Sequence, residues 1–224
     1  MTASKVPPLW ICLLGALSAA LGLCGCQLVG GMVENYRRDA THAVQPEYTG
    51  MQDKSFAVLV TADRSLHSEY PELVPFLTDR MTQRLASPGN KPKPAGFVPP
   101  SQVLKYQLSK PAWSAKPLPD LATELGGVQR LILVDLFEFR LRDPGNAYEW
   151  AGQAGATVSV VELDGAMPDQ FSFERMVQVK FPDQKGHGPD SIAQSLVQSA
   201  LAGRLIDRTT WLFYEHQEPY YPTY

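Results

Sequence analysis

One long apolar segment, residues 129–142, constrains the fold more than any other part of the chain. Its first half, from Leu131 to Val134, is apolar at every position, which is typical of a strand that is covered on both faces. From Asp135 onward, apolar and polar residues alternate, which is typical of a strand with one face in solvent. We therefore expect a strand that begins beneath helices and continues past their cover.

This strand is expected to open an antiparallel meander of three strands. The turn residues Asp143, Pro144, Gly145 and Asn146 predict a hairpin after it. Its return strand is predicted to combine residues 148–150 and 156–163, and a third strand is predicted at residues 171–181, where apolar and polar residues alternate again. The hairpin would present an apolar face and a polar face. The apolar face would carry Phe137, Phe139, Leu141, Tyr148 and Trp150, and the polar face Glu138, Arg140 and Arg142.

Strands and helices alternate in the rest of the chain, which predicts an α/β (α+β) fold. We expect a single mixed sheet with the three-strand meander, flanked by helices and closed by a long C-terminal helix. Before the meander the pattern predicts a strand at residues 56–60, a helix at 71–85, a short strand at 97–98, and helices at 103–108 and 121–125. The closing helix is predicted at residues 191–215, with a buried stripe of Ile192, Leu196, Val197, Ala200, Leu201, Leu205 and Ile206.

The N-terminal segment has the features of a secretory leader. Lys5 precedes an uncharged apolar run at residues 9–23, which is shorter than the roughly 20 residues of a membrane-spanning helix. The run ends in Leu23-Cys24-Gly25-Cys26, which resembles a bacterial lipobox. The resemblance implies cleavage after residue 25 and a lipid on Cys26, with Cys24 as a rival lipidation site. It also implies that Gln27 favours the outer membrane, where an Asp would favour the inner one.

Cysteine usage and charge exclude several functions. The three cysteines, Cys12, Cys24 and Cys26, all lie in or at the end of the leader. The body of the protein therefore has no disulfide, thiol nucleophile or cysteine metal site. The net charge is −3 and no basic stripe is present, so nucleic acid is not an expected partner.

Four segments are predicted along the chain. They are a signal peptide at residues 1–25, a lipidated tether at 26–53, one globular domain at 54–215 and a Tyr/Pro-rich tail at 216–224. The element order of the domain, together with the lipobox, is similar to the curli-export lipoprotein, the penicillin-binding-protein activator lipoproteins and the Tol N-terminal domain. It is also similar to uncharacterised envelope lipoproteins. These resemblances imply a scaffold or assembly factor of the cell envelope.

Few residues have the spacing that catalysis or metal binding requires. His42, His67, His187 and His216 form no pair at metal-ligand spacing, and neither a nucleophile elbow nor a phosphate loop is present. No metal and no cofactor are expected. Asp135 is a candidate for a functional carboxylate. It interrupts a segment predicted to be buried, and a buried carboxylate needs a partner. Its partner is predicted to be Arg130, Arg175 or Arg204, in a salt bridge or in a functional site.

Aromatic residues are concentrated near the C-terminus. Tyr214, Tyr220 and Tyr221 lie there among prolines, and Trp150 belongs to the hairpin. Tyr and Trp dominate binding hot spots, so these four residues are predicted to contact a partner. The alternative is that the residues near Trp211 complete the core and the tyrosines lie over the domain.

The sequence therefore predicts a non-enzymatic outer-membrane lipoprotein that faces the periplasm. It would act as a scaffold, assembly or trafficking component, bound to the membrane through its lipid and to another envelope protein or a second copy. One alternative is an oligomeric export-channel component similar to the curli-export lipoprotein, built from the hairpin. Another is a hydrolase of envelope polymers that uses Asp135 and Glu138 as paired carboxylates.

Overall fold

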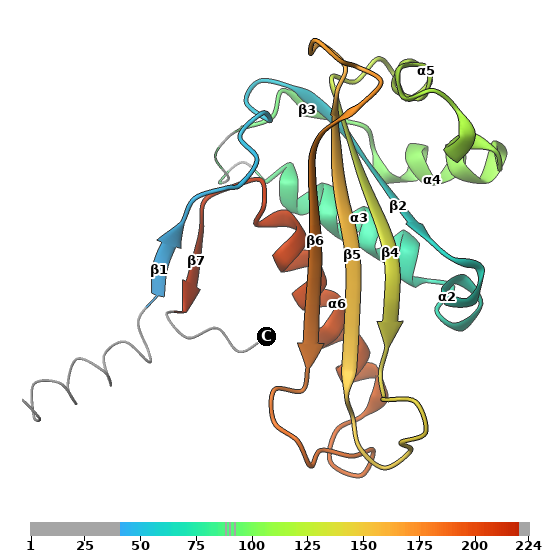
Figure 1. Cartoon of the computed structure of the whole chain (residues 1–224), viewed down its shortest axis with the longest axis vertical. Coiled ribbons are helices and arrows are strands. Elements are labelled where there is room, and N and C mark those ends of the chain that lie inside the picture. Colours follow the sequence, from blue (N-terminus) through green and yellow to red (C-terminus); the bar gives the residue numbers. More distant parts are fainter. Residues whose placement is uncertain (1–40, 88, 90, 92, 220–224) are drawn as a thin grey trace, which may run out of the picture. The chain divides into compact units, whose positions relative to one another are not determined.

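A five-stranded mixed sheet organises residues 44–216 in the computed structural model, which describes residues 41–219 except 88, 90 and 92 (Figure 1). The strand order is β3-β2-β4-β5-β6, with β2 parallel to β3 and β4, and β4, β5 and β6 antiparallel in succession. The predicted fold class and meander are therefore confirmed. The strands are β2 (Ser55–Ala62), β3 (Gly96–Phe97), β4 (Arg130–Arg140), β5 (Gly152–Glu162) and β6 (Phe171–Phe181).

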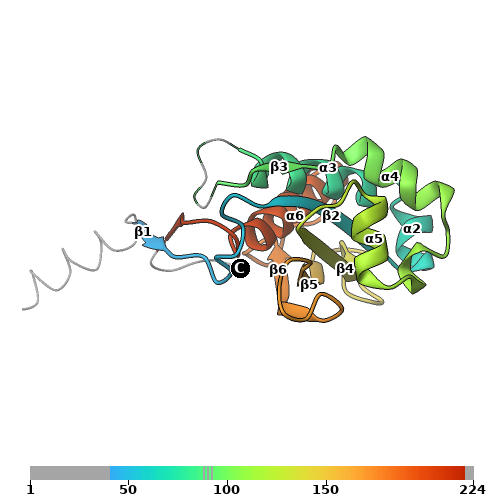
Figure 2. The same ribbon diagram turned by 90° about the horizontal axis from the view of Figure 1, so that it is seen from above.

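Helices cover the two faces of this sheet to different extents. Two long helices pack on one face across β2, β4, β5 and β6, whereas two shorter ones cover only part of the other face, near β2 and β4 (Figure 2). The long helices are α3 (Leu73–Leu85) and α6 (Gln194–Thr210), and the shorter ones are α4 (Pro100–Ser109) and α5 (Leu118–Glu124). Helix α2 (Arg64–Glu69) and a 3-10 turn, η1 (Trp113–Ala115), connect these elements.

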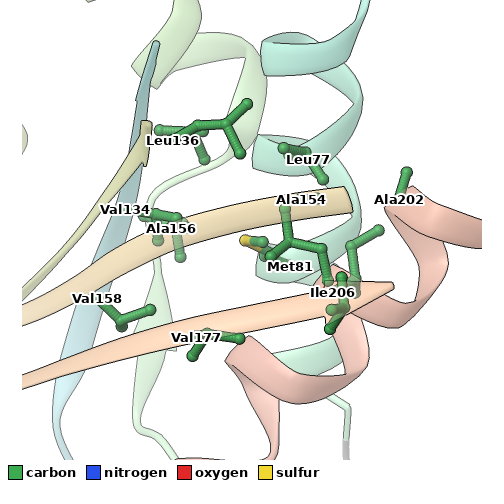
Figure 3. Close-up of a cluster of buried hydrophobic side chains, with 14 of the residues drawn as sticks. Leu77, Met81, Val134, Leu136, Ala154, Ala156, Val158, Val177, Ala202 and Ile206 are labelled. Carbon is green, nitrogen blue, oxygen red and sulfur yellow. The ribbon is translucent and has the colours of Figure 1, made fainter. Parts of the chain in front are cut away.

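The larger core lies between the sheet and the pair α3 and α6. Leu77 of α3, Leu136 of β4 and Ala156 of β5 are fully buried there (Figure 3). Burying a leucine side chain such as that of Leu77 or Leu136 contributes about 1.5–3 kcal/mol. A smaller core joins α4 and α5 to the opposite face of β2 and β4, and includes Leu59, Val103, Leu121 and Leu131.

A β-bulge in β4 changes which side chains share a face. The register with β5 shifts between Leu136 and Glu138, so Phe137 is the extra residue. Phe139 is buried, whereas Phe137 is exposed and lies against Gly155, where an added Cβ would come within 2.5 Å of its ring. The prediction that Phe137 and Phe139 share one face was wrong because the bulge breaks the alternation.

Several element boundaries differ from the predictions. Residues 148–150 are outside β5. Helix α2 occupies part of the stretch between the predicted strand at 56–60 and the predicted helix at 71–85, where the Asp63 side chain accepts a hydrogen bond from the Leu66 amide at 2.8 Å. Helix α6 is shorter than predicted at both ends. Leu196, predicted in its buried stripe, is 57% exposed because it lies in the first turn, on the solvent side.

The segment predicted to be a tether contains ordered structure. Tyr48 and Met51 are buried in the larger core, and the Tyr48 amide donates to the Leu212 carbonyl at 2.9 Å. Packing therefore begins before the predicted boundary at residue 54. Strands β1 (Thr41–Val44) and β7 (His216–Pro219) form a separate two-stranded sheet.

Two leucines of α6 provide a matched test of this core. Leu205 is 0% exposed, so Leu205→Ala is expected to lower the free energy of unfolding by about 2–5 kcal/mol. Leu196→Ala, the same substitution at an exposed position, should change it by less than about 0.5 kcal/mol. Urea unfolding of both variants measures the difference. Equal effects would show that the buried face of α6 has been assigned incorrectly.

Candidate functional site

A groove lies at the carboxyl end of β2, where its parallel pairing with β4 ends. Such edges, at the carboxyl ends of parallel strands, are where α/β proteins commonly bind ligands. The groove has a volume of about 790 Å³, within the range of small-molecule and cofactor sites. It is lined by the end of β2, by Asp135 of β4, by His67, Pro71, Val74 and Pro75, and by Leu104, Gln107, Leu108, Trp113 and Ser114.

The walls of the groove are mostly apolar. Leu108, near the end of α4, is 83% exposed although it is a leucine, and Trp113 of η1 is half-buried. Transfer of a leucine side chain from water to an apolar contact is favourable, so Leu108 adds apolar surface that a molecule bound in the groove would cover. Leu108 was not identified in the sequence, where it reads as part of the apolar pattern of a helix.

An ionic cluster fixes the segment that contains Trp113, which lines the groove. Glu124 of α5 accepts hydrogen bonds from Lys110 Nζ at 2.6 Å, from Lys116 Nζ at 2.5 Å and from the Tyr106 hydroxyl at 2.6 Å. These donors, Lys110 first, lower the pKa of the Glu124 carboxyl to about 2. The cluster links both ends of the segment that contains η1 to α5.

The groove has few polar groups, and these lie near the end of β2. The Thr61 hydroxyl donates to Asp135 Oδ1 at 2.9 Å, and Gln107 Nε2 donates to the Val60 carbonyl at 3.1 Å. Asp135 is exposed, and none of the ion pairs among the described residues involves it. The prediction of a buried Asp135 paired with an arginine was therefore wrong, because the helical cover of this face ends between Leu133 and Asp135.

Arg130, predicted as a partner of Asp135, belongs to another network at the start of β4. It is 5% exposed, and its guanidinium donates to the Gly50 carbonyl at 2.8 Å and to the Asp164 carboxylate. Tyr48 donates to Glu162 Oε1 at 2.7 Å beside it, and burial raises the pKa of Tyr48. This buried charge is satisfied on several sides and joins residues 48–50 to the sheet.

The other two predicted arginine partners pair elsewhere. Arg175 contacts Glu47 at 3.2 Å, and Arg204 pairs with Asp183. Each pair connects two surface segments, and neither arginine pairs with Asp135.

A second groove lies between α3 and α6 and has a volume of about 740 Å³. Arg80 and Arg84 contribute to its lining, and Arg84 pairs with Asp207. Tyr214 lies at its wall but is buried, with its hydroxyl 3.2 Å from Thr210 Oγ1.

Of the four predicted partner-contact residues, the two that the structure describes are buried. Tyr214 is buried, and Trp150 is buried with its indole N–H donating to the Ile192 carbonyl at 2.9 Å. Both side chains complete the core, so neither offers a surface to a partner in this structure. Tyr220, Tyr221 and the predicted lipidation site Cys26 lie outside the described residues, and their roles stay predictions.

The two carboxylates of the hydrolase alternative lie on the same face of β4. The register places Asp135 opposite Thr157 and Glu138 opposite Gly155, because the bulge restores Glu138 to that face. However, Glu138 accepts a hydrogen bond from Arg140 Nε at 2.8 Å and is not part of the groove lining. The groove therefore contains one carboxylate, whereas glycoside hydrolysis requires two that face one substrate.

The export-channel alternative requires a row of charged side chains on the polar face of the hairpin, and these side chains are engaged in other contacts. Glu138, Arg140 and Asp143 pair with one another, while Arg142 packs over the Trp150 ring, 4.2 Å from its centroid. Arg142 therefore covers a core residue instead of joining a row of charges.

Metal-binding clusters and membrane-spanning helices are both absent from the part of the chain that the structure describes. Within it, no group of three His, Cys, Asp or Glu residues is placed to hold a metal ion. In the same residues, no helix is both long and apolar enough to cross a membrane.

Comparison with known proteins yields structural similarity only. No family model and no curated protein matches the sequence. A PelC dodecamer from Paraburkholderia phytofirmans is 10% identical, with a TM-score of 0.43 over 79% of this chain and 99% of that one. Lipoprotein GNA1162 from Neisseria meningitidis is 10% identical, with a TM-score of 0.44 over 68% and 95%. Protein XCC0632 from Xanthomonas campestris is 13% identical, with a TM-score of 0.34 over 75% and 84%.

The Arg130 network predicts an acid-sensitive contribution to stability. Lys54 and Arg130, as hydrogen-bond donors, lower the pKa of the Asp164 carboxyl from 3.8 to about 2. A carboxyl with a lowered pKa stabilises the fold above its unfolded pKa, and this contribution is lost as the pH falls from about 4 to about 2. Asp164→Asn should therefore lower the free energy of unfolding at pH 7 by about 1 kcal/mol, a value reduced for partial exposure.

Urea unfolding of both proteins across this pH range measures the contribution. The difference between them should shrink toward zero near pH 2. Asp169→Asn, at an exposed turn position, serves as the control and should leave stability unchanged. A difference that is independent of pH would contradict the assigned role of Asp164.

Proposed function

We propose that this chain is a lipid-anchored, non-enzymatic protein of the bacterial outer membrane that faces the periplasm. It acts as a scaffold, assembly or trafficking component by binding another envelope protein. The observation that carries the proposal is the apolar groove at the carboxyl end of β2, beside the middle of β4, with Leu108 exposed on its rim. Apolar grooves with few polar groups are typical of binding sites.

The polar groups in this groove support binding over catalysis. The Thr61 hydroxyl donates a hydrogen bond to the Asp135 carboxylate, and no histidine is hydrogen-bonded to either group among the described residues. A nucleophilic site requires a third group that orients the base. Thr61 and Asp135 instead form a fixed acceptor at one end of an apolar surface.

Membrane attachment can be tested through Cys24 and Cys26. Cys26→Ser is expected to abolish labelling by a fatty acid and to move the protein from the membrane to the soluble fraction. Cys24→Ser, a matched control two residues away, should retain the lipid and the membrane location. The lipid on Cys26 is the predicted attachment to the membrane, and stable anchoring takes more than one acyl chain. Loss of the lipid should therefore release the protein. The opposite result would make Cys24 the lipidated residue.

Partner binding can be tested by affinity purification of the full-length lipidated protein from its own envelope. Leu108→Glu places a charge on the groove and should reduce recovery of a specific partner by about tenfold or more, equivalent to about 1.4 kcal/mol. Leu196→Glu introduces the same charge at an exposed position on α6 and should leave recovery unchanged. Equal loss in both variants, or in neither, would reject the groove as the contact surface.

A further inference from the structure

The lining of the groove at the carboxyl end of β2 carries a net negative charge. Asp135 is the one carboxylate among its lining residues, and that lining contains neither lysine nor arginine. Lys110 and Lys116, which flank Trp113 in the sequence, are paired with Glu124. His67 is the remaining titratable group of the lining. The groove therefore favours a positively charged ligand over a negatively charged one.

The geometry of Asp135 leaves one oxygen for a ligand. Thr61 donates to Oδ1 at 2.9 Å, which fixes the orientation of the carboxylate. Oδ2 receives no hydrogen bond from any residue that the structure describes. An ionised carboxylate accepts several hydrogen bonds, and those from an ammonium or guanidinium are the strongest. Oδ2 is thus available to a cationic donor in the groove.

Apolar walls adjoin this carboxylate. Leu104 and Leu108 of α4, with Trp113 of η1, line the groove together with Val74 of α3. A ligand that contacts both the wall and the carboxylate must combine apolar surface with a cation. The groove between α3 and α6 differs in this respect, because its lining includes Arg80 and Arg84.

We propose that the groove binds a segment of a partner protein in which a lysine or arginine lies among apolar side chains. The ammonium or guanidinium donates to Asp135 Oδ2, and the apolar side chains pack against Leu108 and Trp113. The aliphatic part of a lysine or arginine side chain can itself cover apolar surface while its charged end reaches a carboxylate. This inference rests on the proposed function and specifies the chemistry of the partner.

The test uses small probes that carry one charge each, so that it does not depend on the identity of the partner. Full-length lipidated protein in phosphatidylglycerol nanodiscs is titrated with n-butylammonium, n-butanol and butyrate. Methyl resonances of Leu104 and Leu108 report binding by NMR. Butylammonium should bind about two- to fivefold more tightly than butanol, the range that partly exposed ion pairs provide, and butyrate more weakly than both.

Asp135→Asn keeps the size of the side chain and removes its charge, so it should abolish the preference for butylammonium. Asp190→Asn, which removes an exposed carboxylate from the loop before α6, is the control and should retain the preference. Equal binding of the three probes, absence of binding, or a preference that survives in Asp135→Asn would overturn the inference.

Two further results separate this inference from the proposed function. If partner recovery still depends on Leu108 but no charge preference is found, the cationic segment is rejected and the proposed function stands. If the Leu104 and Leu108 resonances shift when phosphatidylethanolamine replaces phosphatidylglycerol in the nanodisc, the occupant is a lipid amine, and a protein segment is rejected.

Discussion

The parallel pairing of β2 with β4 is the constraint on which the rest of the structure depends. It runs from Phe56 opposite Arg130 to Ala62 opposite Leu136, and the central residues of both strands are buried on both faces. Parallel strands require a long crossover, which here consists of α2, α3, β3, α4 and α5. The same pairing brings Thr61, near the end of β2, beside Asp135 of β4, so the pairing that forms the core also forms the groove.

The network around Arg130 acts at the opposite end of this strand pair. A guanidinium that is 5% exposed must be satisfied, and Asp164 with the Gly50 carbonyl does so. This requirement holds the segment before β2 and the turn after β5 in place. The start of β4 is thus anchored by charge, whereas Asp135, in the middle of the strand, leaves its carboxylate in solvent.

Periodicity was sufficient to predict the sheet, the meander and the main helices. It failed where a single residue changes the pattern. The bulge at Phe137 has no separate signal in an alternating sequence, although Gly155 opposite it supplies the space that the ring requires. Leu196 fits the helical stripe of α6, but the helix begins only two residues earlier, and its first turn extends beyond the packed surface.

The groove was harder to predict than the fold because it depends on where helical cover ends. Leu131, Leu133 and Asp135 share one face of β4, and they pass from buried to half-buried to exposed. An uninterrupted apolar run does not reveal that limit, so Asp135 was predicted to be buried and paired. Its position could be inferred only once α4 and α5 were known to cover part of the face.

Site-specific photo-crosslinking in living cells tests most directly whether this groove is the binding surface. A photo-reactive amino acid replaces Leu108 on the groove or, as a control, Met176, which is exposed on β6. A discrete adduct with one envelope protein from position 108, absent from position 176, is the predicted result. An adduct from position 176 and none from position 108 would place the partner on the open sheet face and contradict the groove as the functional site.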